Sequence, residues 1–167
     1  MTMMQAIEIQ KMTAEKFKPF GDLIDFDRPP SFAINNGMCD RYHALAQTEV
    51  TGTNAQIIIS LGRAKSYSLP LKLEMMERHP YGSQAFIPLQ QAPFLVIVAA
   101  DDGGQPATPN AFMTQAGQGI NYHRNVWHAV LTPIDHSGDF LIVDRIGEEN
   151  NLEEFFFNQP YLVQQQY

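Results

Sequence analysis

The chain has 167 residues and a formal net charge of −7, with 44% hydrophobic and 17% charged residues. This length fits one domain, and we expect a single domain over residues 1–167. The composition is typical of a globular protein and excludes a disordered one. The negative charge argues against binding to nucleic acid or to an anionic membrane, because both rely on a basic protein surface.

The sequence predicts neither export nor a membrane anchor. The longest good apolar run, Phe94–Ala100, is far shorter than the roughly 20 residues of a membrane span. Met1–Gln10 lacks the charged start and the long apolar stretch of a signal peptide. The single cysteine, Cys39, excludes an intramolecular disulfide framework and suits a reducing compartment. We therefore expect a cytoplasmic protein.

Short strand-like runs, separated by turn residues, follow one another along most of the chain. Thr13 is suited to cap a short helix through Phe17, and Leu152–Phe157 is expected to form a short C-terminal helix. A parallel α/β sheet would need longer crossover helices, so the pattern favours an all-β antiparallel sandwich or barrel with a few short helices. The predicted strands are Ile7–Gln10, Gln56–Leu61, Gln84–Leu89, Phe94–Ala100, Ala111–Thr114, Ala129–Thr132 and Phe140–Val143.

The first polar cluster lies between two of these runs. If Glu77–His79 is extended, the Glu77 and His79 side chains share one face and Arg78 points to the other. A Pro-Tyr-Gly turn follows and brings Gln84 back toward that face. A carboxylate, an imidazole and an amide at one place can bind a divalent metal or transfer protons. The alternative is an ordinary surface turn.

The second polar cluster combines His123 and His128 with Arg124, Asn125 and the only tryptophan, Trp127. A regular strand would place two histidines five residues apart on opposite faces. Both can line one site only if the chain turns between them, and Arg124-Asn125 is a plausible turn. Imidazoles offer acid–base chemistry near neutral pH, and an arginine offers a planar fork for a carboxylate. The alternative is an aromatic-rich strand with ordinary hydrogen-bonded histidines.

Two weaker candidates lie outside these clusters. Arg41 and His43 have the same strand parity, so an extended segment would turn both toward one pocket. Asp144 follows the apolar run Phe140–Val143, where a strand-terminal ion pair is the alternative to a site residue.

These motifs together carry a resemblance to a known family. They are Ile34–Gly37, Arg41–His43, Glu77–Pro80, Gln84–Pro88, Asn121–His128 and Asp144-Arg145. Over essentially its whole length the chain resembles the ureidoglycolate lyase family. The resemblance implies a cupin-like β-barrel (a double-stranded β-helix or jelly roll) and a homodimer. It also implies a lyase that releases urea from (S)-ureidoglycolate to give glyoxylate in allantoin and purine degradation.

The match to the wider cupin metal pattern is partial. Glu77 falls where metal-binding cupins place a first histidine, His79 matches the second, and Gln84 replaces the usual glutamate. His128 matches the histidine of the second cupin motif. The resemblance therefore leaves a candidate divalent-metal site, for nickel or manganese, with Glu77, His79 and His128 as its ligands.

Breaking the C–N bond of ureidoglycolate requires one base for its hydroxyl and one acid for the departing nitrogen. The hypothesis assigns these roles collectively to three histidines, with Glu77 orienting an imidazole. Arg41, Arg78 and Arg124 are candidate cations for the substrate carboxylate, and a metal could supplement or replace them. Of the three, Arg78 is the weakest candidate, because strand alternation turns it away from Glu77 and His79. The histidines are His79, His123 and His128, and the other substrate-binding candidates are Gln84, Asn125, Trp127 and Asp144.

Two other classes of function stay open for such a domain. A cupin-like module can bind a small carboxylate without turning it over, and other cupins are metal-dependent oxygenases or isomerases. Release of urea from ureidoglycolate would separate the lyase hypothesis from both alternatives. Metal analysis with chelation would separate the metal-dependent enzymes from the rest.

Overall fold

The computed structural model describes residues 3–166, so Met1, Thr2 and Tyr167 of the expected domain lie outside it. Within this range strands form almost all of the regular structure, and helix α1 (Ala14–Phe17) is short. The strands are β1 (Gln5–Lys11), β2 (Gly21–Ile24), β3 (Phe32–Ile34), β4 (Cys39–Arg41), β5 (Gln56–Ala64), β6 (Leu71–Arg78), β7 (Gln84–Pro88), β8 (Phe94–Ala99), β9 (Asp101–Asp102), β10 (Gln105–Pro106), β11 (Asn110–Met113), β12 (Gly119–Tyr122), β13 (Trp127–His128), β14 (Thr132–Pro133), β15 (Gly138–Ile146) and β16 (Glu153–Gln164).

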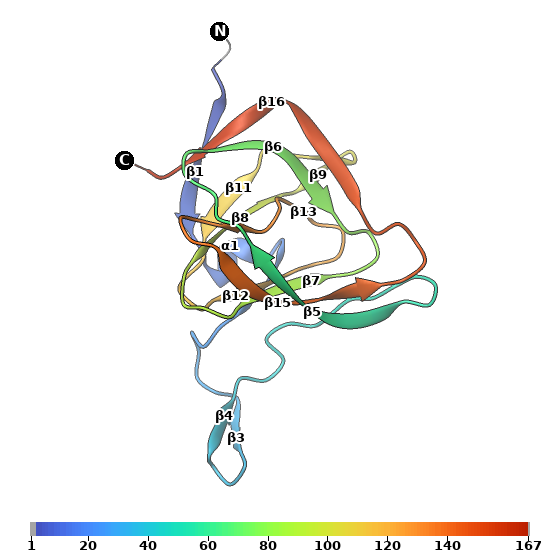
Figure 1. Cartoon of the computed structure of the whole chain (residues 1–167). Coiled ribbons are helices and arrows are strands. Elements are labelled where there is room, and N and C mark those ends of the chain that lie inside the picture. The colour runs from blue at the N-terminus through green and yellow to red at the C-terminus, as the bar shows by residue number, and fades with distance from the viewer. Residues whose placement is uncertain (1–2, 167) are drawn as a thin grey trace.

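Six strands close into a barrel, which confirms the predicted all-β, cupin-like fold. Their order is β11-β1-β16-β6-β13-β8, and β8 pairs with β11 to complete the ring. A second sheet, with the order β2-β12-β7-β15-β5, lies beside this barrel (Figure 1). Strand β1 runs parallel to both β11 and β16, whereas the other strand pairs described for the two sheets are antiparallel.

Strand β8 separates two hydrophobic cores. Its residues alternate: Leu95 and Ile97 belong to the core inside the barrel, while Phe94, Val96 and Val98 belong to the core between the barrel and the second sheet. Both faces of β8 are therefore buried, which explains why its sequence is a continuous apolar run rather than an alternating one. The layer between the sheets also receives Phe86, Ile120, Tyr122 and Phe140 from the second sheet.

The predicted C-terminal helix at Leu152–Phe157 is wrong. This segment belongs to β16, where Phe155 pairs with Met76 and Phe156 with Met75 on β6. Acidic residues at its start favour a helix, but consecutive phenylalanines favour a strand, and Pro160 prevents a helix from continuing. The packing of the phenylalanines against β6 decides the outcome.

The predicted strand at Ala129–Thr132 is also wrong for most of its length. The chain forms two short strands there, β13 and β14, which both pair with β8. His128 lies opposite Val98, and Thr132 lies opposite Leu95. The chain thus advances four residues from His128 to Thr132 while the paired strand β8 advances three. The extra residue interrupts the ladder as a bulge does.

The remaining predicted elements are confirmed within a few residues of their ends. Thr13 caps α1, and its hydroxyl accepts a hydrogen bond from the Lys16 amide at 3.2 Å. The other six predicted strands correspond to β1, β5, β7, β8, β11 and β15. No helix within the described residues is long and apolar enough to cross a membrane.

A hairpin projects from the body of the molecule at residues 26–43, and we call this segment the arm (Figure 1). Strands β3 and β4 pair with each other in the arm, with Phe32 opposite Arg41 and Ile34 opposite Cys39. The turn at its tip contains Asn35, Asn36 and Gly37, all with positive φ. Asn and Gly accept this conformation most readily, so the tip follows from its sequence.

Candidate active site

The candidate active site lies where three connections of the chain pass between the two sheets, and one of them is residues 147–152 between β15 and β16. Residues 79–83 lead from β6 of the barrel to β7 of the second sheet, and residues 123–126 lead from β12 back to β13. These last two connections touch, because the Asn125 amide donates to the His79 carbonyl at 2.9 Å. Both polar clusters of the sequence therefore meet at one end of the layer between the sheets.

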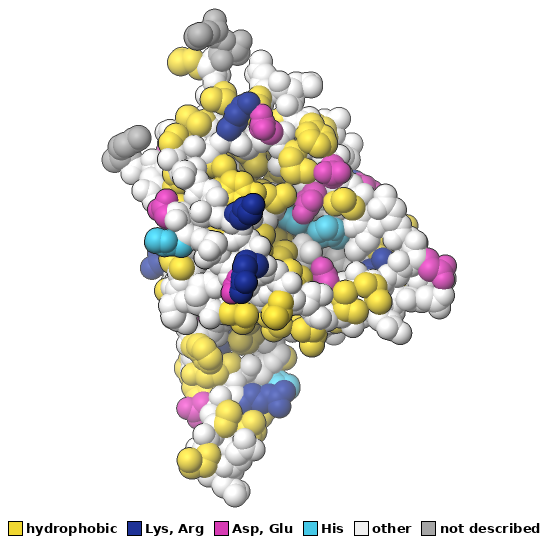
Figure 2. Space-filling model, viewed as in Figure 1, with side chains coloured by type: hydrophobic (Ala, Val, Ile, Leu, Met, Phe, Trp, Pro, Cys, Tyr) yellow, Lys and Arg dark blue, Asp and Glu magenta, His cyan; other side chains and the backbone are white. Residues whose placement is uncertain are grey.

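A cavity of about 360 Å³ opens at this end, and we call it the cleft. Figure 2 looks onto the molecule from the same side as Figure 1 and shows histidine side chains in a hollow of this face, with acidic side chains near them. The residues that line the cleft are Glu77, His79, Ser83, Gln84, Asp144, Arg145, Asn151 and Leu152.

Strand alternation explains why these side chains point into the cleft. Glu77 pairs directly with His128 across β6 and β13, and their neighbours Met76 and Trp127 belong to the core inside the barrel. Glu77 and His128 must therefore point out of the barrel toward the second sheet. The same alternation applies to the second sheet. Gln84 lies on the same face of β7 as the core residue Phe86, and Asp144 lies on the same face of β15 as Ile142, so both polar side chains also point toward the barrel.

A chain of hydrogen bonds holds His79. The Gln84 amide nitrogen donates to Asp144 Oδ2 at 3.0 Å, which turns the Gln84 Oε1 atom toward His79 Nε2 at 3.1 Å. His79 Nδ1 lies 2.8 Å from the carbonyl oxygen of Asn151. Both ring nitrogens of His79 thus face oxygen acceptors, and this arrangement suits a ring that carries a proton on each nitrogen.

His128 is held in the opposite state. Its Nδ1 atom lies 2.9 Å from the Ala129 carbonyl, so Nδ1 carries the proton of the neutral ring. The Nε2 atom is buried and has no hydrogen-bond partner among the described residues. Burial is the main cause that lowers the pKa of His128 to about 3, and the nearby His79 lowers it further. The hydrogen bond to Ala129 opposes this only in part.

Two neighbours of His128 complete its surroundings. Tyr122 stacks on the imidazole with ring centroids 4.2 Å apart, and burial, followed by the charge of Glu77, raises the pKa of its hydroxyl. The Glu77 pKa is also raised, mainly by burial, although His79 acts in the other direction. The cleft therefore contains, in Glu77, a carboxylate that binds its proton more tightly than usual, and the neutral imidazole of His128 and the protonated phenol of Tyr122 are buried next to it.

Glu77, His79 and His128 also form the metal-ligand set that the sequence predicts. One ligand atom from each of the three lies within 4.8 Å of the others. The buried, unpartnered Nε2 atom of His128 fits a metal ligand, and a carboxylate with two imidazoles suits nickel, manganese or zinc. His79 Nε2 would have to leave Gln84 to join them.

Several candidates from the second cluster lie outside the cleft. The chain does turn at Arg124-Asn125, yet His123 Nε2 lies 3.1 Å from Asp22 Oδ2 rather than near His128. His123 and Arg124 line a separate open cavity with residues 44–49. Asn125 occupies the turn, with φ 65°.

The side chains of Trp127, Arg78 and Arg41 also point away from the cleft. Trp127 lies in the barrel core, where its indole donates to Asp101 and Arg78 stacks on its ring at 4.3 Å. Arg78 thus points away from Glu77, as strand alternation predicts. Arg41 lies on the exposed arm, with its guanidinium over Phe32.

Three residues of the site were not assigned a role from the sequence. Tyr122 could have been found, because it lies two positions after the buried Ile120 on the same strand face. Arg145 lines the cleft but is engaged with the Thr51 carbonyl at 2.7 Å and with Glu149. Asn151 lies in the loop between β15 and β16, and no pattern in the sequence indicates its contact with His79.

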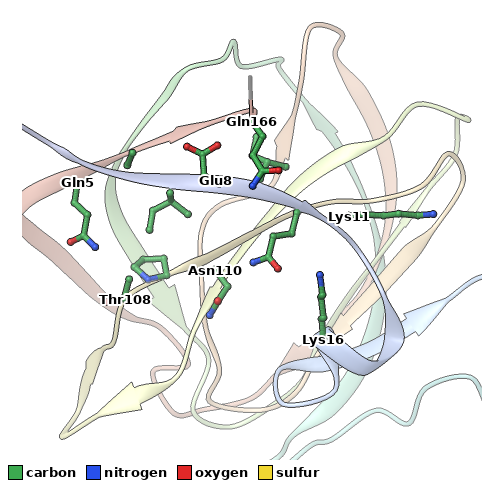
Figure 3. A pocket seen from close by; sticks show the side chains of 12 residues that line it. Gln5, Glu8, Lys11, Lys16, Thr108, Asn110 and Gln166 are labelled. Atoms are coloured by element: carbon green, nitrogen blue, oxygen red, sulfur yellow. The ribbon is translucent and has the colours of Figure 1, made fainter.

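Another hollow of about 570 Å³ lies along β1. Figure 3 shows its side chains spread along the strand, with Glu8 apart from Lys11 and Lys16. Glu8 is bound by the Gln164 amide at 2.9 Å. This hollow does not gather histidines or paired carboxylates from the described residues, so we assign the chemistry to the cleft.

Comparison with known proteins points to one family. The family model described as ureidoglycolate lyase matches residues 4–164. A ureidoglycolate lyase of Chelativorans sp. is 56% identical over 96% of this chain and 97% of its own length. One from Mesorhizobium japonicum is 54% identical over 96% and 98%, and ureidoglycolate lyase 2 of Rhizobium meliloti is 50% identical over 95% and 97%.

Proposed function

The chain belongs to the ureidoglycolate lyase family, and we propose that it releases urea from (S)-ureidoglycolate to give glyoxylate by acid–base chemistry in the cleft. The observation that carries the mechanism is the convergence of Glu77, His79 and His128 with their ligand atoms within 4.8 Å. Glu77 and His79 line the cleft, and the buried His128 pairs with Glu77 across β6 and β13.

The reaction needs two proton transfers and no added water. One carbon of ureidoglycolate carries a hydroxyl, a carboxylate and the ureido nitrogen. A base removes the hydroxyl proton, the oxygen becomes a carbonyl, and the C–N bond breaks. An acid protonates the departing nitrogen so that neutral urea leaves. Each transfer by a positioned side chain typically contributes about 10²–10⁴-fold.

We assign the acid to His79 and the base to Glu77. The hydrogen bonds of His79 to Gln84 and Asn151 favour a proton on both nitrogens, and Nε2–H is the proton that faces the cleft. Burial raises the Glu77 pKa and so makes its carboxylate a stronger base. His128, with a pKa of about 3, is a poor base, so we assign it neither of the two proton transfers.

Polar groups on the second sheet are suited to bind the ureido end of the substrate. Gln84 and Asp144 line the cleft opposite the barrel and offer acceptor oxygens to the N–H groups of urea. Asn125, Trp127, His123 and Arg124 lie outside the lining residues, so we assign them no contact with the substrate within one chain.

A divalent ion, nickel or manganese, is proposed as a cofactor for the same triad. Glu77, His79 and His128 would hold it, and when bound it would supply positive charge beside the substrate hydroxyl. His79 cannot donate Nε2–H to the substrate and ligate metal at that atom at once. Assay after EDTA treatment therefore separates the two mechanisms: unchanged kcat/KM supports acid–base catalysis alone, and loss that nickel or manganese restores supports the metal.

The experiment that tests the function is turnover of ureidoglycolate by the purified protein. Glyoxylate and urea should appear in equal amounts, and the (S)-enantiomer should be consumed. Binding without turnover would instead indicate a carboxylate-binding module. Oxygen uptake or an isomerised product would indicate the other cupin activities.

We further propose that the protein is a homodimer in the cytoplasm and acts in allantoin and purine degradation. The dimer accords with the exposed arm, which no part of the described chain covers. The acidic surface and the free Cys39 accord with a cytoplasmic location.

A further inference from the structure

The arm is ordered as a hairpin although it receives little support from its own chain. Its described backbone hydrogen bonds close within the arm, as between the Ser31 amide and the Arg41 carbonyl. Almost all its residues are exposed, and Figures 1 and 2 show it projecting away from both sheets. An isolated two-stranded hairpin is marginally stable in water, so a covering surface is expected.

The arm carries large apolar side chains without cover. Phe26 is 79% exposed, Met38 is 86% exposed and Phe32 is 46% exposed. Side chains of this size gathered on one projecting segment are typical of an interaction surface.

One face of the arm combines apolar and cationic groups. Phe32 lies opposite Arg41, whose guanidinium is 5.9 Å from the phenyl centroid, and the His43 ring is 5.4 Å from the same phenyl. By strand alternation Cys39 shares this face, whereas Asp40 points to the other. This face therefore offers a planar cation and an imidazole beside an aromatic anchor.

The cleft, by contrast, has no free arginine or lysine among its described lining residues. Glu77 and Asp144 are acidic, and Arg145 is already held by Thr51 and Glu149 and stacks on Tyr81 at 5.2 Å. A substrate with a carboxylate needs a cation there, and its charge would otherwise be repelled by both acidic residues.

We infer that the arm of one copy covers the cleft of a second copy and supplies Arg41 to the substrate carboxylate. Charge complementarity favours a second copy as the partner, since the arm brings a free guanidinium, which the described lining of the cleft lacks. A two-fold axis makes the exchange reciprocal, so each site is built from two chains. This inference rests on the proposed function, because the carboxylate is that of ureidoglycolate.

Trans-complementation tests the inference. Arg41→Ala should raise KM about 10-fold or more, while Asp40→Asn on the opposite face of β4 should stay near wild type. A heterodimer of Arg41→Ala and Glu77→Gln chains, co-expressed with two tags, should regain about half the wild-type activity, since one of its two sites is intact. A heterodimer no more active than the two parent variants would overturn the inference.

A cross-link gives a readout that does not depend on turnover. Cys39 is the only cysteine, so a Leu152→Cys variant has one thiol on the arm and one at the cleft. A short bismaleimide should join two chains and double the mass on a denaturing gel, and Cys39→Ala in the same background should abolish this product. Only intramolecular linkage, or a monomeric protein in solution, would contradict the inference. Absence of turnover in the wild-type enzyme alongside an intermolecular cross-link would refute the proposed function but leave the covering arm standing.

Discussion

Two effects act on the pKa of Glu77: burial, the larger one, raises it, and the charge of His79 lowers it. If Glu77 is the base, Glu77→Gln keeps the shape of the side chain but removes its proton acceptor. We expect kcat to fall about 10²–10⁴-fold with little change in folding. Glyoxylate formation measures the loss, and Glu74→Gln, an exposed carboxylate on the same strand, is the control. Equal activities in the two variants would exclude Glu77 as the base.

Asp144 acts through Gln84 rather than on the reacting atoms. Its carboxylate accepts only, so it fixes the Gln84 amide with the oxygen toward His79. In Asp144→Asn the amide can turn over and offer its NH₂ group to His79 Nε2. We expect kcat to fall about 10-fold or more, because His79 Nε2 would then accept a hydrogen bond from Gln84 instead of donating one. Asp139→Asn, on the same strand and outside the cleft, should keep the wild-type kcat.

His128 makes stability depend on pH. Its pKa is about 3 in the folded protein against an ordinary 6.5, so unfolding takes up a proton between these values. The free energy of unfolding should therefore fall as the pH drops through this window, by at most about 1.4 kcal/mol per pH unit from this group. Urea unfolding at several pH values measures the slope. A His128→Asn variant should show a flatter slope, and an identical slope would show that His128 titrates normally.

At the scale of elements, β8 contributes to both cores at once. Ile97 is fully buried inside the barrel, so Ile97→Ala should leave a cavity and lower the free energy of unfolding by about 2–5 kcal/mol. Ile59 on the edge strand β5 is 73% exposed, and Ile59→Ala should change stability by no more than about 0.5 kcal/mol. Urea denaturation compares the two. Similar losses would show that the exposed face of β5 is covered in solution.

Elements with a strong local pattern were predictable from the sequence, and those decided by packing were not. The apolar run of β8 and the cap at Thr13 carry their own signals. Strand β16 has helix-favouring acidic residues at its start and strand-favouring phenylalanines after them, and its pairing with β6 decides between the two. The bulge between β13 and β14 likewise depends on the register along β8, which the sequence does not encode locally.

At the scale of the whole molecule, the cleft depends on three connections between the two sheets, which local patterns predict only in part. Parity along one strand correctly groups Glu77, His79 and the returning Gln84. Strand alternation does not predict that His123 lies next to Asp22, because this contact depends on the pairing of β12 with β2. Asn151 reaches His79 from 72 positions away, beyond any spacing argument.

Removing the arm should separate assembly from folding. Replacing residues 32–41 with a short Gly-Ser linker leaves both cores untouched, because neither contains an arm residue. We expect the far-ultraviolet circular dichroism of the β body to persist while light scattering reports a monomer. A truncated chain that still forms dimers would show that another surface joins the copies.

The double burial of β8 has a consequence for how the protein opens. Strand β8 lies between the two hydrophobic cores, and its backbone pairs with β11 on one side and with β13 on the other. Deuterium uptake there should require global unfolding, whereas the hairpin at residues 32–41 should exchange through local fraying. Because Val98 on β8 pairs with His128, the pairing of β8 with β13 should be among the last parts of the molecule to unfold.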